Sequence, residues 1–585
     1  MRRPLDGTSI AGPWTRPTDR NDRSGVVLVV VLVVVVMVAF AGFGFVASMS
    51  TEYEAVKLDA GRIQSDQVLA SAEALLEWYV DHPRLPGDPL LSADPAAMFR
   101  SVRLNTADGD DAARYGGSPQ IGDVPVQTPP EGPSQTLENS WRFTVLSPVT
   151  DGGSQSHAAG LTESRISPDG VPLTRIQFGP ASESGRLNLE LLLEFDAAQP
   201  GSGRESLMRL AGLTPDAADS LLDWIDVDDV RREFGAEAVD YQRQSLPYRP
   251  RNGLPETIAE LLFVRGITRS GLFGLDANRN FHVDDVESAE RGKPDGLEQT
   301  AETRFSGNSD EPPSGWADLV TIYSVERNLD SEGFPRIDLN SADLKSLHQA
   351  LAEIVSREMA DFVVLMRQYG PVESSADDVP VSLASVDLSE PASFSINAIS
   401  DLCGSTGAVN TRSEFIPAAS PMDLATQEGR RLLKVFLTRT SVTDEPLIRG
   451  RLNINLAGQR VLQSVPGLSD SAVGRLISRR ETLDPESRLT TVWLIEEDIL
   501  TVETYRAVQP WLTTGGDAFR CQIIAFRPRG GPSKRVELVT GPTEKGPRRF
   551  FWRDLTGSGM GFPVSVYGPP ATEQSEMSAA GFQQE

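Results

Sequence analysis

The sequence contains few of the residues that usually carry catalysis. It has two cysteines, Cys403 and Cys521, and four histidines among 585 residues. No His/Cys cluster has the spacing of a zinc site, and the GxSxG, Walker A and GxGxxG motifs are absent. The sequence therefore predicts a protein that is not an enzyme. It leaves open whether the two cysteines pair or stay apart as buried thiols.

Positive charge is also scarce. The chain has 55 Lys and Arg against 82 Asp and Glu, a formal net charge of −27 and a pI of about 4.7. A surface of this sign repels nucleic-acid phosphates, so no nucleic-acid partner is predicted. The length suits about three or four domains.

One long segment lacks charge altogether. The run from Val26 to Ala47 contains no ionisable residue. As a helix it would be about 33 Å long, which matches a bilayer core of roughly 30 Å. Residues 1–25 before it carry more arginine than aspartate, so this leader should stay in the cytoplasm. The sequence therefore predicts a single-pass anchor with the bulk of the chain on the far side of the membrane.

The helix should continue beyond the anchor to about Val80, because Pro83 and Pro86 end it. Two apolar sides are expected on this continuation. The first comprises Val56, Ala60, Ile63, Ala70, Ala74 and Trp78, and the second comprises Leu69, Ala72, Leu75, Leu76 and Tyr79. Alternating patterns predict strands at Ser140–Val149, Pro172–Ser182, Phe519–Arg529, Lys534–Pro542 and Arg548–Leu555, whereas residues 84–140 read as loop.

Three stretches of the chain resemble one another: Arg186–Asp226, Arg336–Gly370 and Arg451–Glu481. Each opens with a short Leu/Ile and Asn/Asp stub and continues as two helical patterns around a turn. Gly212 of the first stretch aligns with Gly467 of the third. The next residues, Thr214 and Ser469, are good helix N-caps.

These paired helices resemble helix-hairpin-helix modules, which often bind a phosphate backbone through hairpin N–H groups. Arg475, Arg479 and Arg480 would support phosphate binding, but the alternative is that the hairpins only pack helices. The acidic end of the first copy favours packing, because its aspartates would repel phosphate. These aspartates are Asp223, Asp226, Asp228 and Asp229.

An acidic stretch begins at Asp276. Six of its residues fall at positions 1, 3, 5, 7, 9 and 12 of a calcium-loop template: Asp276, Asn278, Asn280, His282, Asp284 and Glu287. Oxygen ligands at this spacing would wrap one Ca²⁺, with position 7 supplying its backbone carbonyl. The template has glycine at position 6, where this sequence has Phe281. Calcium binding is therefore one reading, and a solvated acidic turn is the other.

The start of the chain resembles a type IV prepilin N-terminus: a basic leader that ends in Gly25, followed by a hydrophobic helix from Val26. The resemblance implies that a prepilin peptidase cuts between these two residues and methylates the new amine of Val26. Prepilins usually carry Glu at the fifth mature position, where this sequence has Val30. The minor pseudopilin K of type II secretion systems characteristically lacks that Glu. Four later segments resemble pseudopilin K in order: "LLDWIDVDD", "LPYRPRNGLPETIAELLFVRGIT", "RIDLNSAD" and "LNINLAGQRVLQSVPGLS".

The resemblance implies an α+β fold: a long transmembrane and amphipathic N-terminal helix packs on a small antiparallel pilin-like sheet. A large, mostly helical domain with helix-hairpin-helix (SAM-like) units is inserted into that sheet. Along the chain we expect a leader at 1–25, a spine helix at 26–82, loops and pilin-like strands at 83–185, an inserted helical domain at 186–450, a helix-hairpin-helix-like unit at 451–515, C-terminal strands at 516–556 and a disordered tail at 557–585.

The implied function is to cap the tip of the periplasmic pseudopilus with the minor pseudopilins I and J, above the major pseudopilin. The pseudopilus supports export of folded proteins across the outer membrane. The chain would then be an inner-membrane protein with a periplasmic head, and the family resemblance also implies calcium in the inserted domain. The alternative is a membrane-anchored DNA-uptake receptor that uses its helix-hairpin-helix modules.

Overall fold

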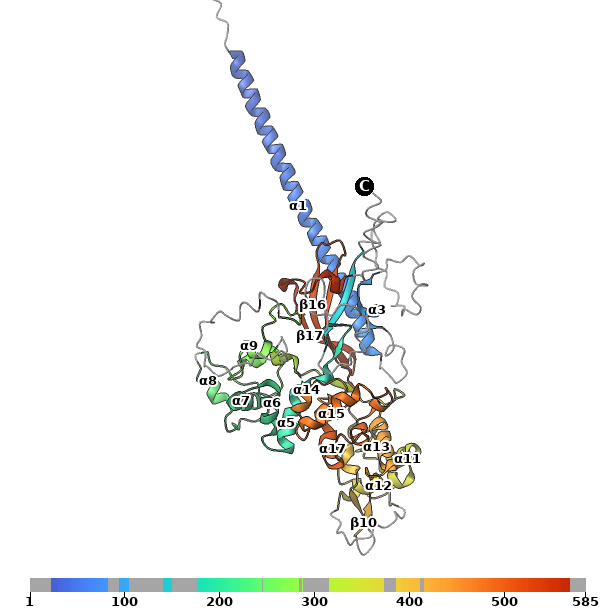
Figure 1. The fold of residues 1–585 in the computed structure, drawn as a ribbon. Coiled ribbons are helices and arrows are strands. Elements are labelled where there is room, and N and C mark those ends of the chain that lie inside the picture. The colour runs from blue at the N-terminus through green and yellow to red at the C-terminus, as the bar shows by residue number, and fades with distance from the viewer. Residues whose placement is uncertain are drawn as a thin grey trace, which may run out of the picture. The chain divides into compact units, whose positions relative to one another are not determined.

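The structure is a computed structural model of the chain (Figure 1). It describes residues 23–82, 94–104, 140–149, 176–244, 246–283, 287, 315–372, 386–410 and 415–568. The chain divides into two compact units, Met1–Gln64 and Ser65–Glu585. Most of the leader, residues 1–22, and the end of the tail, residues 569–585, lie outside the described residues.

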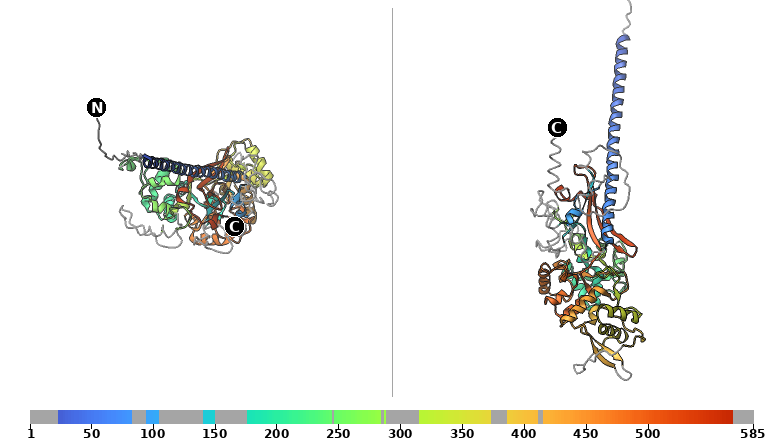
Figure 2. Two further views of the ribbon diagram at one scale, coloured as in Figure 1. Left: turned by 90° about the horizontal axis from the view of Figure 1, so that it is seen from above. Right: turned by 90° about the vertical axis from the view of Figure 1, so that its right-hand side faces the viewer.

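Helix α1 comprises Arg23–Asp81 and is drawn from two further sides in Figure 2. Its end confirms the expectation from the two prolines. Its apolar side chains from Val27 to Ile63 are exposed. From Ser65 onward one face is buried, which comprises Val68, Leu69, Ala72, Leu75, Leu76 and Val80.

Only one of the two expected apolar sides of α1 is the buried one. Val56 is 67 % exposed and Ile63 is 54 % exposed, so these two residues of the first side do not pack in the described chain. Ala70 and Ala74 of that side are exposed as well. The second side is buried because its leucines remove more apolar surface from water than alanines do. Both sides are apolar as predicted, but of the first side only Trp78 packs, partly buried, against the sheet core in the described chain.

The buried face of α1 packs on an antiparallel sheet in the order β1-β2-β15-β16-β17, with β3 beside β2 and β4 beside β15 (Figure 1). Tyr79 of α1 also contacts this core, because its ring centroid lies 5.6 Å from those of Phe99 and Phe519. The strands are β1 Val102–Arg103, β2 Arg142–Pro148, β3 Ile176–Phe178, β4 Ala181–Ser182, β15 Phe519–Phe526, β16 Lys534–Thr543 and β17 Gly546–Asp554. The predicted C-terminal strands are confirmed.

Two parts of the sheet region differ from the sequence prediction. Helix α3, Pro95–Phe99, and strand β1 lie in the region that was read as loop, where Asp94 caps α3 and Phe99 is buried. Residues 557–568, the first part of the tail expected to be disordered, are instead ordered, since α18, Val564–Tyr567, packs against the sheet. The Tyr567 ring lies 4.8 Å from the Phe526 ring. Buried aromatic rings therefore order segments whose local composition resembles loop.

The chain between β4 and β15 forms the inserted domain. Each repeat opens with a two-residue strand that pairs in parallel with a distant strand. These pairs are β5 Leu187–Asn188 with β6 Val320–Thr321, β8 Ile337–Asp338 with β11 Thr440–Ser441, and β13 Leu452–Asn453 with β14 Leu512–Thr513. The shared stub in the sequence is thus a shared structural unit.

Paired helices follow the stubs as expected. Thr214 and Ser469 cap the second helix of the first and third repeats, and Gly212 and Gly467 take positive φ angles of 61° and 86° in the turns. Val355 ends α11 in the second repeat, which has no glycine there. The helices are α5 Leu189–Ala198, α6 Ser202–Ala211, α7 Pro215–Ile225, α11 Leu344–Ile354, α12 Arg357–Tyr369, α14 Gln459–Gln463 and α15 Asp470–Arg480.

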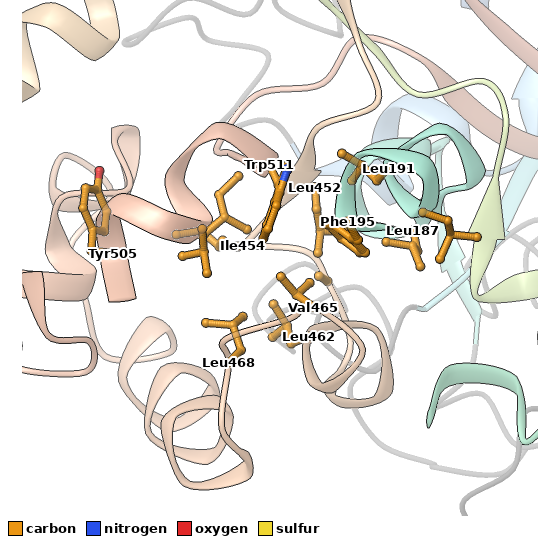
Figure 3. Packing of buried hydrophobic residues seen from close by; sticks show 14 of the residues in the cluster. Leu187, Leu191, Phe195, Leu452, Ile454, Leu462, Val465, Leu468, Tyr505 and Trp511 are labelled. Carbon is orange, nitrogen blue, oxygen red and sulfur yellow. The ribbon is translucent and has the colours of Figure 1, made fainter. Parts of the chain in front are cut away.

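The first and third repeats share one hydrophobic core. Figure 3 shows Leu187, Leu191 and Phe195 facing Leu452 and Trp511, and the Phe195 and Trp511 rings are 4.7 Å apart. Reciprocal hydrogen bonds join the two units. Arg209 donates to the Gln463 carbonyl at 3.1 Å, and Arg460 donates to the Leu210 carbonyl at 2.9 Å.

Shorter elements complete the inserted domain. They are the helices α8 Ala238–Gln242, η4 Ile258–Phe263, α9 Arg269–Phe273, η5 Gly315–Asp318, η6 Ile399–Leu402, α13 Gln427–Arg439, α16 Trp493–Glu496 and α17 Val502–Val508, and the strands β7 Val325–Arg327, β9 Thr406–Asn410, β10 Phe415–Ala419 and β12 Leu447–Arg449. Strands β9 and β10 form an antiparallel hairpin, and β7 pairs with β12. Among the described residues of the stretch 371–440, η6, β9, β10 and α13 therefore form regular structure.

A buried ion cluster joins the inserted domain to the sheet. Glu183 lies in the short helix η3, Glu183–Gly185, and is fully buried. Its carboxylate accepts hydrogen bonds from Arg520 of β15, at 2.8 Å, and from Thr321 of β6. Arg520 also donates to Glu537 of β16 at 3.2 Å. The cluster therefore connects β6 of the inserted domain with two strands of the sheet.

Candidate functional site

The expected processing site lies at the start of α1. The backbones of Gly25 and Val26 are helical, while their side chains lie outside the described residues. Val30, five positions into the mature chain, is 56 % exposed on an uncharged apolar surface. In the described chain, α1 is the one helix long and apolar enough to cross a membrane. The helix therefore fits a single-pass anchor, and cleavage after Gly25 stays a prediction.

The expected calcium loop forms a tight turn that brings its first and last residues together. Asp276 and Glu287 are 3 % and 9 % exposed. The Asp276 carboxylate accepts the backbone N–H groups of Asn280 and Phe281, at 3.0 and 2.8 Å. The Glu287 carboxylate accepts the N–H of Asn278 at 3.1 Å. Of the six expected ligands, Asp284 lies outside the described residues.

The backbone of this loop accommodates the missing glycine. Phe281 takes a φ of 65° at position 6, a left-handed conformation that glycine adopts more easily. Asn280 is 2 % exposed, and its side-chain oxygen accepts the N–H of His282 at 3.0 Å. Burial, with a smaller contribution from Glu287, raises the pKa of Asp276 to about 7. The loop thus holds one buried carboxylate, that of Asp276, whose charged form is disfavoured by burial.

A second acidic cluster, which the sequence did not single out as a site, follows helix α7. Carboxylate oxygens of Asp226, Asp228 and Glu237 all lie within 4.8 Å of one another. Glu237 is 5 % exposed, and neither of its carboxylate oxygens has a hydrogen-bond partner in the described chain. One oxygen of Asp226 also lacks a partner, while Arg232 bonds the other. Three converging carboxylates with unused oxygens suit a hard divalent cation.

The raised pKa values of the carboxyl groups in this cluster also suit a bound cation. Burial, together with the charges of Asp223 and Asp226, raises the pKa of Glu237 to about 7. Burial also raises the pKa of Asp223 to about 6, although Arg232 opposes the shift. Gly235 lies against Asp223 so closely that a Cβ there would be 1.8 Å from the carboxylate. The close spacing of Asp223, Asp226 and Asp228 was a visible sequence signal for an acidic cluster. Glu237 was not part of that signal, because it lies at the start of a different helix, α8.

The hairpin arginines are all used inside the protein. Arg475 donates to the Asp498 carbonyl at 2.8 Å, and Arg479 pairs with Glu497 at 2.7 Å. Arg480 is 3 % exposed and donates to two backbone carbonyls. These guanidinium groups therefore fasten helices together, which favours the packing interpretation of the hairpins over phosphate binding.

The two cysteines are separate buried thiols. Cys403 lies in the core of the inserted domain and Cys521 in the core of the sheet, and both are free. Burial raises the pKa of the Cys403 thiol to about 12 and raises that of Cys521 as well. The structure therefore resolves the question that the sequence left open: the cysteines do not pair.

The region that holds the acidic cluster matches a known protein family. Residues 185–275 match the family model of type II secretion system (T2SS), protein K. This segment of the chain is therefore similar to the protein K family. The acidic loop begins directly after the matched residues. None of the curated proteins compared with the chain matches it.

The match to protein K supports a coarse function. It supports a pseudopilin role in type II secretion, a structural component of the secretion machinery. The exposed apolar half of α1 fits the membrane anchor of such a component. Its mixed helix and sheet fold, with a long apolar N-terminal helix and a small antiparallel sheet, agrees with the expected fold class.

Proposed function

We propose that this chain is a member of the protein K family that caps the tip of the type II secretion pseudopilus and supports export of folded proteins across the outer membrane. The observation that carries the proposal is the combination of a bulky protein K domain with Val30 on an uncharged apolar helix. In a pilin-like stack, Glu at this position neutralises the terminal amine of a neighbouring subunit. A subunit with Val30 leaves such an amine unpaired, which suits the end of the stack.

The proposed pathway begins at the inner membrane. Prepilin peptidase removes residues 1–25 and methylates Val26, and α1 anchors the chain with its head in the periplasm. The minor pseudopilins I and J join it there, and the major pseudopilin extends the shaft below. The ion cluster around Glu183 supports this role, because it fixes the inserted domain on the sheet.

Deletion of the gene tests the assembly role. We expect loss of export of the secreted proteins, while other inner-membrane proteins stay in place. Affinity purification of the tagged chain should recover I-type and J-type minor pseudopilins. Export at the wild-type level in the deletion strain would contradict the proposal.

The DNA-receptor alternative loses support from the contacts of Arg475, Arg479 and Arg480. We propose that the paired helices are helix-hairpin-helix units that serve packing. A filter-binding assay with the purified chain distinguishes the two, and we expect no retention of duplex DNA at physiological salt. Submicromolar affinity under those conditions would favour the DNA receptor.

We also propose that the inserted domain binds Ca²⁺, at Asp226, Asp228 and Glu237 and in the loop from Asp276. The unpartnered, buried carboxylate of Glu237 supports the first site. The left-handed Phe281 and the buried Asp276 support the loop, where Asn278, Asn280, His282, Asp284 and Glu287 complete the proposed ligands. Oxygen donors of this kind are those that Ca²⁺ prefers.

Isothermal titration of the purified chain with CaCl₂ tests both sites. We expect heat that Glu237→Gln and Asp276→Ala each reduce and that the double variant abolishes. Glu428→Gln is the matched control, because Glu428 is 68 % exposed on α13. No heat at millimolar calcium would reject both sites, and unchanged heat in one variant would reject the corresponding site.

A further inference from the structure

Two arginines share one aromatic ring beside the acidic loop. The guanidinium carbon of Arg279 lies 4.7 Å from the centroid of the Phe273 ring, and that of Arg269 lies 6.0 Å from it. Cation–π contacts of this kind engage the face of a guanidinium group. The N–H edges then stay available for the forked hydrogen bonds that arginine makes with carboxylates.

A third arginine approaches from the sheet. In the register of the sheet, Arg553 of β17 lies opposite Glu537 of β16, and Glu537 lies opposite Gln522 of β15. The Gln522 amide donates to the carbonyl of Arg279 at 2.8 Å, so the loop sits on this face of the sheet. Partial burial and the positive charges of Arg279 and Arg269 lower the pKa of Arg553. The three charges are therefore within electrostatic reach of one another.

Within the described chain, these charges have no dedicated counterion. The guanidinium groups of Arg269, Arg279 and Arg553 make no ion pair within 4.0 Å of a carboxylate there. Glu537, which lies opposite Arg553 in the sheet, forms an ion pair with Arg520 at 3.2 Å. Asp276 is occupied by backbone N–H groups of its own loop. Among the described residues, three arginines without an ion pair therefore gather here, in a chain whose net charge is −27.

The site lies beside an open edge of the sheet. Among the described strands, β17 is the last in the order β1-β2-β15-β16-β17, so its outer backbone groups have no neighbouring strand. A ligand can approach Arg553 from this edge. We propose that Arg269, Arg279 and Arg553 form a docking site for an acidic segment of a partner protein, whose carboxylates bind the three guanidinium groups. The partner's charge follows from complementarity, which steers association and sets specificity.

Fluorescence anisotropy with a hexaglutamate peptide tests this site. The peptide carries a neutral dye, and the full chain is purified in a non-ionic detergent at physiological ionic strength. We expect Arg269→Gln, Arg279→Gln and Arg553→Gln each to weaken binding by about 5-fold or more, as the loss of one charge-assisted contact predicts. The triple variant should abolish binding. Arg553→Lys should give an intermediate affinity, because lysine keeps the charge but lacks the fork.

Arg431→Gln is the matched control, since Arg431 is 77 % exposed on α13 and distant in sequence from the three arginines. It should bind the peptide as the wild type does. The near-ultraviolet circular dichroism of each variant should match the wild type, and Arg→Lys replaces any Arg→Gln variant that loses this signal.

Three results would overturn the docking site. They are equal binding of a hexaglutamine peptide, unchanged affinity in the triple variant, or displacement of the peptide by an equal concentration of inorganic phosphate. The last would show that the cluster takes any small anion and would remove the protein partner from the proposal.

Discussion

Replacement of Glu183 by glutamine should weaken the attachment of the inserted domain to the sheet and lower the stability of the fold. The Glu183 carboxylate is fully buried, accepts two hydrogen bonds from Arg520, at 2.8 and 3.3 Å, and lies 3.7 Å from Arg186. Glutamine preserves the size of the side chain and removes its charge. Arg520 would then be buried with Glu537 as its one remaining ion-pair partner in the described chain.

The size of the effect follows from the pKa of Glu183. Burial would raise this pKa, but Arg520 and Arg186 outweigh it and lower the pKa from 4.5 to about 2. Each tenfold change in proton affinity corresponds to about 1.4 kcal/mol, so the charged form stabilises the folded state by about 3 kcal/mol. Removal of one partner from other buried ion pairs destabilises proteins by about 3–5 kcal/mol. We therefore expect Glu183→Gln to lower the free energy of unfolding by about 3 kcal/mol at pH 7.

Urea unfolding in a mild detergent, followed by tryptophan fluorescence, measures this difference. Because the folded pKa is depressed, the contribution is fully present above about pH 4.5 and is lost as the pH falls toward about 2. The wild type should therefore approach the variant in stability at low pH. Glu428→Gln, at an exposed position on α13, should match the wild type throughout. Equal unfolding midpoints of Glu183→Gln and wild type at pH 7 would refute the reasoning.

The remaining predictions concern the N-terminus and the thiols. Gly25→Leu should block processing, and mass spectrometry should detect the full leader; an uncut wild-type chain in cells with active prepilin peptidase would contradict the site. Val30→Glu should insert into the membrane normally but disturb tip placement, so unaltered pseudopilus length and secretion would count against the capping argument. Alkylation in denaturant without reductant should modify both Cys403 and Cys521, because both are buried free thiols; a chain that resists labelling until it is reduced would contradict their separation.

Local signals in the sequence predicted local structure well. Thr214 and Ser469 were identified as caps because N-cap preference depends on a few adjacent residues. The end of α1 and the three C-terminal strands were likewise predicted from proline and from period-two alternation. The repeated stubs were found by pattern, but their parallel partner strands were not, since these lie 60 or more residues away, as for Leu452 and Leu512.

The sites depend on contacts between residues that are distant in the sequence, and a local sequence pattern does not reveal such contacts. The loop from Asp276 was visible because its donors follow one template. Glu237 joins Asp226 and Asp228 only through the fold, so the acidic cluster was missed. Arg553 and Arg279 are brought together by the register of β15, β16 and β17. The buried face of α1 was uncertain for the same reason: both sides were apolar, and the partner sheet selected one.

Gold labelling of an epitope-tagged chain on intact pseudopili tests the central claim most directly. The tag is placed after Glu585, and labelled filaments are imaged by electron microscopy in cells that overproduce the major pseudopilin. Our account predicts gold at one end of each filament and none along the shaft. Label distributed along the whole shaft would contradict the capping function.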